Sequence, residues 1–314
     1  MAGATVADAA VGSRAWGAKG LVLVQTRGFE VAMACERVGY SPLNENAVEY
    51  AISATKAYVD ELERRAVCLN GKSILEIGPG AEFASALVLA SYGASVTLAD
   101  RFLAPWDAEF HPHFYREFLL RWEGPKSAIE AVIKRGGYEG VLRLLSRPAE
   151  SLEGISGESI DLVLSNAVLE HLSDLPKAIR EMARITRPGG VHSHQVDCRD
   201  HRNFARPLDH LLIPEAEFSA ERERTGCVRG TQTRLQEILE AFVPFFWVDA
   251  FEPNSFADTD YLNSLMLHRQ ERIQAFSVQS LRVTGGRLWL SKKRFERRNM
   301  RFLNPKRIVD AFRF

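Results

Sequence analysis

Runs of apolar residues that end in polar ones predict several buried strands. Residues 73–77, 96–100 and 159–166 consist mainly of Ile, Leu, Val and Ala, and they carry Glu76, Asp100 and Asn166 at or near their ends. Continuous apolar runs of this length are typical of parallel strands that are covered on both faces. Segments with helical spacing lie between them. The alternation predicts an α/β fold built on a parallel sheet.

The chain before the first of these strands reads as helical. Residues 44–65 carry apolar side chains at helical spacing, namely Val48, Ala51, Ile52, Tyr58, Val59 and Leu62. We therefore expect helices over residues 26–70, forming a cap over the mouth of the site. Residues 1–20 are rich in alanine and glycine and are expected to form a loose tail.

The segment of residues 102–147 is longer than one strand and one helix require. We expect it to form an inserted helical lid that recognises the substrate. Phe114, Phe118 and Trp122 recur every four residues, a spacing that puts them on one helix face. They either pack the lid or line a substrate pocket. The candidate substrate-binding residues of this segment are His111, His113, Tyr115 and Arg116.

The remainder of the chain completes the sheet. Residues 231–242 read as a helix, 245–251 as a strand and 258–275 as a further helix. Residues 287–291, after a Gly285-Gly286 turn, are expected to form the last strand, which is antiparallel. The predicted domains are a tail and cap (1–70), a catalytic domain (71–293) and a basic C-terminal tail (294–314).

Composition and charge narrow the class of protein. The 314 residues are 46% hydrophobic, which is enough for a sizeable core, yet no apolar stretch is long enough to span a membrane. We expect no secretory signal, because residues 1–20 lack a charged start followed by an apolar stretch, and the four cysteines stand far apart, which favours a reducing cytoplasm. The net charge of zero argues against nucleic acid as a partner, because nucleic-acid binding needs a basic surface.

The turn after the first strand has the chemistry of a nucleoside site. Gly78 and Gly80 allow the backbone to approach a ligand closely, and Pro79 stiffens the turn. A carboxylate near the end of one strand, Glu76, is followed by another at the end of the next, Asp100. This layout is that of a Rossmann-type half, in which the second carboxylate binds ribose hydroxyls.

The residues after the turn decide between ligands. The dinucleotide pattern G-x-G-x-x-G requires a third glycine where this chain has Phe83, and Glu82 adds a negative charge where a pyrophosphate would lie. A diphosphate is therefore disfavoured. Glu76 suits a ligand with a cationic amino group, so the site fits S-adenosyl-L-methionine (SAM) better than NAD.

The motif Glu76-Ile-Gly-Pro-Gly80 resembles the first motif of the class I SAM-dependent methyltransferases, from which it departs at Glu82. The order of segments from Ser159 to Asp197 is similar to that of the methyltransferase type 11 group. The resemblance implies a Rossmann-like, doubly wound, seven-stranded sheet with SAM as cofactor. The residues expected to bind the cofactor are Glu76, Gly78, Pro79, Gly80, Asp100, Arg101, Ala149, Glu150, Asn166 and Ala167.

The pair Glu170-His171 resembles an E-x-x-E-H loop that holds a divalent metal in some ubiquinone-biosynthesis and small-RNA methyltransferases. The first glutamate of that pattern is Ala167 here, so the ligand set is incomplete and we expect no metal. His171 then either orients its loop or contacts the substrate.

The segment from His192 to His201 holds the candidate catalytic residues. His192 and His194 share one side of a strand, because residues two apart face the same way. One interpretation makes His194 a general base with Asp197 or His201 as its orienting partner, since imidazole has a reference pKa of about 6.5. A structural hydrogen-bond network and a metal site are the alternatives.

Together these features predict a cytoplasmic SAM-dependent methyltransferase that acts on O or N of a small molecule or of a glycan or lipid intermediate. The alternatives are an RNA methyltransferase and a non-catalytic SAM-binding partner subunit. A homodimer is compatible with the sequence.

Overall fold

A computed structural model describes residues 18–26, 29–37, 45–225 and 230–294, which divide into two compact units, residues 1–45 and 46–314. In the first unit, β1 (Ala18–Thr26) and β2 (Phe29–Arg37) form an antiparallel hairpin. The predicted helix is therefore wrong over residues 29–37. Phe29, Val31, Met33 and Cys35 alternate with smaller or polar residues, and this period of two favours a strand.

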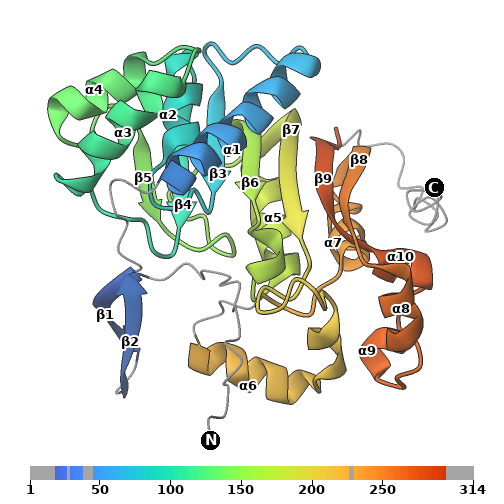
Figure 1. The fold of residues 1–314 in the computed structure, drawn as a ribbon. Helices are drawn as coiled ribbons and strands as arrows, with labels where there is room; N and C mark the ends of the chain where they lie inside the picture. The colour runs from blue at the N-terminus through green and yellow to red at the C-terminus, as the bar shows by residue number, and fades with distance from the viewer. Residues whose placement is uncertain (1–17, 27–28, 38–44, 226–229, 295–314) are drawn as a thin grey trace, which may run out of the picture. The chain divides into compact units, whose positions relative to one another are not determined.

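The second unit is built on one seven-stranded sheet (Figure 1). Its spatial order is β5 (Arg143–Ser146), β4 (Ser95–Asp100), β3 (Ser73–Ile77), β6 (Ile160–Asn166), β7 (Thr186–Asp197), β9 (Val283–Lys292) and β8 (Phe246–Phe256). The strands from β5 to β7 pair in parallel, whereas β9 is antiparallel to both of its neighbours. The predicted Rossmann-like sheet with an antiparallel last strand is confirmed.

Helices bury the sheet. α5 (Leu175–Ile185) and α7 (Leu235–Phe242) pack on strands β3, β6, β7 and β9 in one apolar cluster. α2 (Ala84–Ser91) is almost entirely apolar and packs against α4 (Ser127–Arg135), with α3 (Phe110–Arg121) beside it. Figure 1 shows α2, α3 and α4 gathered near β4 and β5. The helices cover the faces of the sheet, and open α/β sheets of this kind bind ligands at the carboxyl ends of their strands.

A smaller apolar core lies in the C-terminal third. It joins η2 (Asp209–Leu212) to α8 (Thr259–Leu265), α9 (Glu271–Gln274) and α10 (Val278–Arg282). The helix expected over 258–275 is thus two helices, because Gln270 has an extended backbone (φ −62°, ψ 134°) that interrupts helical hydrogen bonding. α6 (Glu215–Thr225) follows η2 in the chain.

The Gly285-Gly286 pair does not form the expected turn but lies inside β9. A Cβ at Gly286 would stand 2.5 Å from Cε2 of Phe251 on β8, and one at Gly285 would stand 2.8 Å from the carbonyl oxygen of Val196 on β7. Glycine is needed here because neighbouring strands approach closely.

Two further predictions concern the helix over residues 44–65 and the C-terminal tail. α1 (Glu45–Arg64) is helical, as expected for residues 44–65. The predicted basic tail lies outside the described residues except for Arg294. No helix among the described residues has both the length and the apolar character needed to cross a membrane.

Candidate active site

The turn after β3 requires both of its glycines. Gly78 (φ 65°) and Gly80 (φ 75°) adopt left-handed backbone conformations. A Cβ on Gly78 would also lie 2.4 Å from Cγ2 of Val168 in the loop after β6. The Gly78 amide donates to the carbonyl of Ala99 at 3.0 Å, which holds the turn against β4. Conformation and close packing therefore both restrict position 78 to glycine.

Glu76 is buried beneath this turn, and none of the described residues compensates its charge. Its side chain is 5% exposed, and Oε2 has no hydrogen-bond partner among the described residues. Burial, with a further contribution from the negative charge of Glu82, raises the pKa of Glu76 to about 8. A buried carboxylate of this kind is stabilised by a cationic group of a ligand.

Glu82 brings a second carboxylate to the same turn. Burial raises its pKa, although hydrogen bonds from the amides of Glu82 and Ala81 oppose the shift. Within the described residues, neither Glu76 nor Glu82 forms an ion pair. The turn thus has an uncompensated acidic character, which favours a positively charged ligand.

Asp100 lies partly exposed at the carboxyl end of β4, where Oδ1 accepts a hydrogen bond from the amide of Phe102 at 2.8 Å. The neighbouring predicted cofactor residues brace loops. Arg101 pairs with Glu150 at 3.2 Å, and Glu150 Oε1 also accepts from the amide of Ser173 at 3.2 Å. Ala149 packs in the apolar core. Cofactor contacts by Arg101, Ala149 and Glu150 remain predictions.

Helix α1 contributes residues that sequence analysis did not single out as site residues. Tyr50 Oη lies 3.2 Å from Nδ2 of Asn166, which donates to it at the end of β6. Tyr58 is buried, and burial followed by the charge of Glu76 raises its pKa well above the usual value. Ala167 follows Asn166 with a left-handed φ of 53°. The aromatic positions within the helical spacing of residues 44–65 were the signal that could have identified Tyr50 and Tyr58.

Two predicted substrate residues instead hold α3 against the glycine turn. His111 Nδ1 accepts from the amide of Asp107 at 2.7 Å, and its Nε2 lies 3.2 Å from the carbonyl oxygen of Ala81, to which it donates. The Tyr115 hydroxyl donates to the carbonyl of Glu82 and is fully buried. The substrate assignment of His111 and Tyr115 is therefore corrected, because their polar atoms are already used within the protein.

The other two residues of that prediction differ in their surroundings. Arg116 is exposed, and His113 has a buried Nε2 with no partner among the described residues. Their contacts with a substrate remain predictions. Phe114 and Phe118 are fully buried, so packing is the role of the aromatic stripe.

His194 lies in a buried chain of hydrogen bonds. Its Nδ1 is 2.7 Å from Ser165 Oγ, and its Nε2 is 3.2 Å from Nδ1 of His192. His192 Nε2 is in turn 2.9 Å from Oγ1 of Thr186, whose hydroxyl donates to the carbonyl of Met182 at 2.6 Å. Because Thr186 uses its proton there, both imidazoles donate through Nε2 and accept through Nδ1. Each ring is thereby neutral and fully paired.

This arrangement corrects the prediction that His194 is a general base. The ring is 0% exposed and stacks on Phe242 of α7 at a centroid distance of 5.3 Å. Burial lowers its pKa to about 3. His192 and His194 do share a strand face, as predicted, but that face is covered by α7, so the structural network is the alternative that the structure supports.

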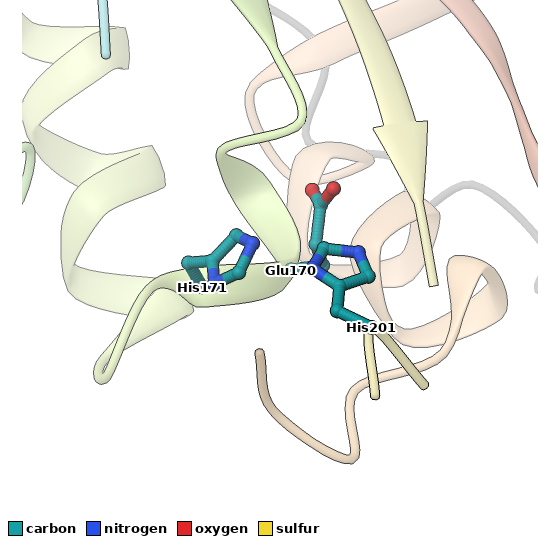
Figure 2. A group of neighbouring side chains, drawn as sticks. All are labelled: Glu170, His171 and His201. Carbon is teal, nitrogen blue, oxygen red and sulfur yellow. The ribbon is translucent and has the colours of Figure 1, made fainter. Parts of the chain in front are cut away.

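Polar side chains do gather where β6 and β7 end. Glu170 and His171 lie on η1 (Leu169–His171), and His201 follows β7 (Figure 2). The His171 and His201 rings have centroids 4.9 Å apart. Glu170 Oε1 accepts from the amide of Asp197 at 3.0 Å, and burial raises the pKa of Glu170 to about 8.

Asp197 is held by its own neighbour. Arg199 donates to both carboxylate oxygens, at 2.8 and 2.6 Å. Burial alone would raise the pKa of Asp197, but the hydrogen bonds and charge of Arg199 outweigh it and lower the pKa. His201 Nε2 lies 3.3 Å from the Asp197 carbonyl oxygen. Asp197 thus contacts His201 chiefly through its backbone carbonyl oxygen.

Comparisons with solved structures give similar folds at low identity. An S-adenosylmethionine-dependent methyltransferase from Mesorhizobium loti is 15% identical (77% of this chain, 99% of that one, TM-score 0.45). The YcgJ protein from Bacillus subtilis is 18% identical (74% and 96%, TM-score 0.41). Phosphoethanolamine N-methyltransferase 2 from Haemonchus contortus, in complex with SAM, is 16% identical (83% and 59%, TM-score 0.46).

The comparison with curated proteins gives no match. The family model for the methyltransferase domain, in contrast, matches residues 49–243, a range that includes the glycine turn, Asp100 and the segment that ends with β7. The chain uses SAM as its cofactor, and it belongs to the methyltransferase domain family.

Proposed function

We propose that this SAM-dependent methyltransferase transfers its methyl group to an oxygen or nitrogen of a small molecule or of a glycan or lipid intermediate. The observation that carries the proposal is the cluster of Glu170, His171 and His201 at the carboxyl ends of β6 and β7. Glu76 and Asp100 occupy the same edge of the sheet, on β3 and β4. A compact group of polar side chains beside the cofactor residues suits a small polar acceptor.

The chain's own residues fit SAM. The unpartnered Oε2 of Glu76 would hold the cofactor's amino group, and Asp100 would hold the ribose hydroxyls. SAM supplies a methyl group that is already activated on a sulfonium. The protein's task is then largely positioning, because holding the acceptor in line removes much of the entropic barrier.

The acceptor's proton is the remaining requirement. His171 and His201 are partly exposed, and an imidazole can accept a proton from a hydroxyl acceptor. Asp197 would orient His201 through its carbonyl oxygen. An amine acceptor would need this help less, so the role of the histidines depends on which atom is methylated.

The test measures S-adenosylhomocysteine formation with three acceptor pools: polar metabolites, glycans with lipids, and total RNA. Turnover with either of the first two supports the proposal, with Gly78→Ala as the inactive control. Turnover with RNA alone would overturn it in favour of RNA methylation, which the net charge of zero disfavours.

A further inference from the structure

The geometry points to a binding site for one divalent first-row transition-metal ion, formed by Glu170, His171 and His201. This inference departs from the expectation of no metal, which rested on Ala167 in the place of a glutamate. It concerns ion binding alone and does not depend on the identity of the methyl acceptor. A bound ion would occupy the imidazole lone pairs that proton acceptance by His171 and His201 requires, so the two roles are alternatives for these side chains.

The three donors come together from two separate segments. Glu170 and His171 lie on η1, and His201 lies thirty residues further along the chain, beyond β7. One donor atom from each lies within 4.8 Å of the others (Figure 2). Bound donors lie about 2.0–2.2 Å from such an ion, so small side-chain rotations are enough to enclose one.

Glu170 supplies an independent indication of a ligand. Its side chain is 2% exposed, and Oε2 has no hydrogen-bond partner among the described residues. The other oxygen, Oε1, is fixed by the amide of Asp197 at 3.0 Å. A buried carboxylate oxygen without a partner is costly unless a cation or donor completes it.

The histidines are held as metal ligands usually are. His201 Nε2 lies 3.3 Å from the Asp197 carbonyl oxygen, and donation to that oxygen leaves Nδ1 with its lone pair for an ion. Hydrogen bonds of this kind orient metal-binding imidazoles. The His171 carbonyl accepts from Nη2 of Arg222 at 3.2 Å, which fixes the backbone that carries the second ring.

Gly230 packs against η1 with a left-handed backbone, and a Cβ there would make ordinary van der Waals contact with the His171 ring. Its φ is 83°, and a Cβ there would stand 3.7 Å from Cε1 of His171. The following amide, of Thr231, donates to the Glu170 carbonyl at 2.7 Å. The backbone around both η1 donors is therefore organised before any ion binds.

The donor set selects the class of ion. Two imidazoles and one carboxylate suit Zn²⁺, Fe²⁺ or Co²⁺, whereas Mg²⁺ and Ca²⁺ prefer oxygen-only shells. Three protein ligands leave at least one coordination position open, as in catalytic zinc sites. Arg199 lies close by, but Asp197 neutralises its charge.

The experiment uses full-length protein that has been stripped of metal with a chelator and titrated with Co²⁺, whose visible absorption reports coordination by nitrogen and oxygen. We expect saturation at one ion per chain and displacement by Zn²⁺. His171→Asn and His201→Asn should each weaken Co²⁺ affinity by at least about 100-fold. His268→Asn, at an exposed histidine outside the cluster, is the matched control and should bind like the wild type.

Glu170→Gln is the variant that guards against misfolding, because its amide oxygen can still accept from the Asp197 amide. It should keep the wild-type circular dichroism spectrum and lose Co²⁺ affinity. Absence of Co²⁺ absorption in the wild type would overturn the inference. Unchanged affinity in both His201→Asn and Glu170→Gln would also overturn it, since the ion would then bind elsewhere.

Discussion

Replacing Gly78 by alanine tests whether the cofactor turn is limited by conformation or by packing. The new Cβ would meet two separate obstacles, the left-handed φ of 65° and Cγ2 of Val168 at 2.4 Å. Gly136 isolates the first, because it has a φ of 70° and no atom of the described part of the chain lies within 4 Å of its Cβ position. The two substitutions therefore share the backbone strain and differ in the steric clash.

The magnitudes separate the two effects. A left-handed alanine costs roughly 1–2 kcal/mol, and the loss of unfolded-state freedom returns about 0.4–1 kcal/mol. Gly136→Ala should thus lower the free energy of unfolding by at most about 1.6 kcal/mol. Overpacking adds about 1–3 kcal/mol, so Gly78→Ala should be destabilised by that much more.

The assay is urea denaturation combined with calorimetric titration of S-adenosylhomocysteine. Adding Val168→Ala to Gly78→Ala removes the clashing methyl group, so the double mutant should recover about 1–3 kcal/mol relative to additivity. Gly78→Ala should also weaken S-adenosylhomocysteine binding by at least about tenfold, equal to about 1.4 kcal/mol, whereas Gly136→Ala should leave it unchanged.

The reasoning is refuted if Gly78→Ala and Gly136→Ala are equally stable. It is also refuted if the losses of unfolding free energy caused by Val168→Ala and Gly78→Ala simply add in the double mutant, because the packing contact would then have no energetic consequence.

Three further predictions follow from the site. Asp100→Asn should weaken S-adenosylhomocysteine binding by about 1.5–3 kcal/mol in calorimetry; a change below twofold contradicts the ribose assignment. Glu76 has a pKa of about 8 without ligand and must ionise to hold an amino group, so affinity should rise about ninefold from pH 6 to 7 and about fivefold from pH 7 to 8; Glu76→Gln should abolish this slope. His194 has a folded pKa of about 3 against a reference of 6.5, so only the unfolded state gains its proton as the pH falls. Wild-type stability should therefore fall by about 1.4 kcal/mol more than that of His194→Leu between pH 7.5 and 5.5; an NMR titration of His194 near pH 6.5 contradicts this.

Much of the fold could be predicted from the sequence, because the order of apolar and polar residues along a segment determines whether that segment forms a buried strand or a helix. Apolar runs identified β3, β4 and β6, and the strand-end positions of Glu76 and Asp100 followed from them. The left-handed turn was predictable because Gly78 and Gly80 are the residues that adopt it without strain. The same reasoning applied to residues 29–37 would have indicated a strand, since their period is two.

Contacts between distant segments could not be predicted in this way. The sequence predicted that His192 and His194 share one face of their strand, but which element covers that face depends on the packing of residues far along the chain. Gly286 likewise reads locally as a turn, yet it is glycine because the Phe251 ring of the next strand lies against it. Periodicity specifies directions along one element and not which element lies opposite.

The sequence by itself determined the fold class, the cofactor turn and the carboxylates near it, because each depends on residues that are neighbours in the chain. The tertiary structure alone decided that His111 and Tyr115 brace the glycine turn and that His201 approaches Glu170 and His171. Side chains thirty residues apart meet only after the strands have taken their register and the loops at the carboxyl edge have folded over it. Their grouping is a property of the whole sheet and of no single segment.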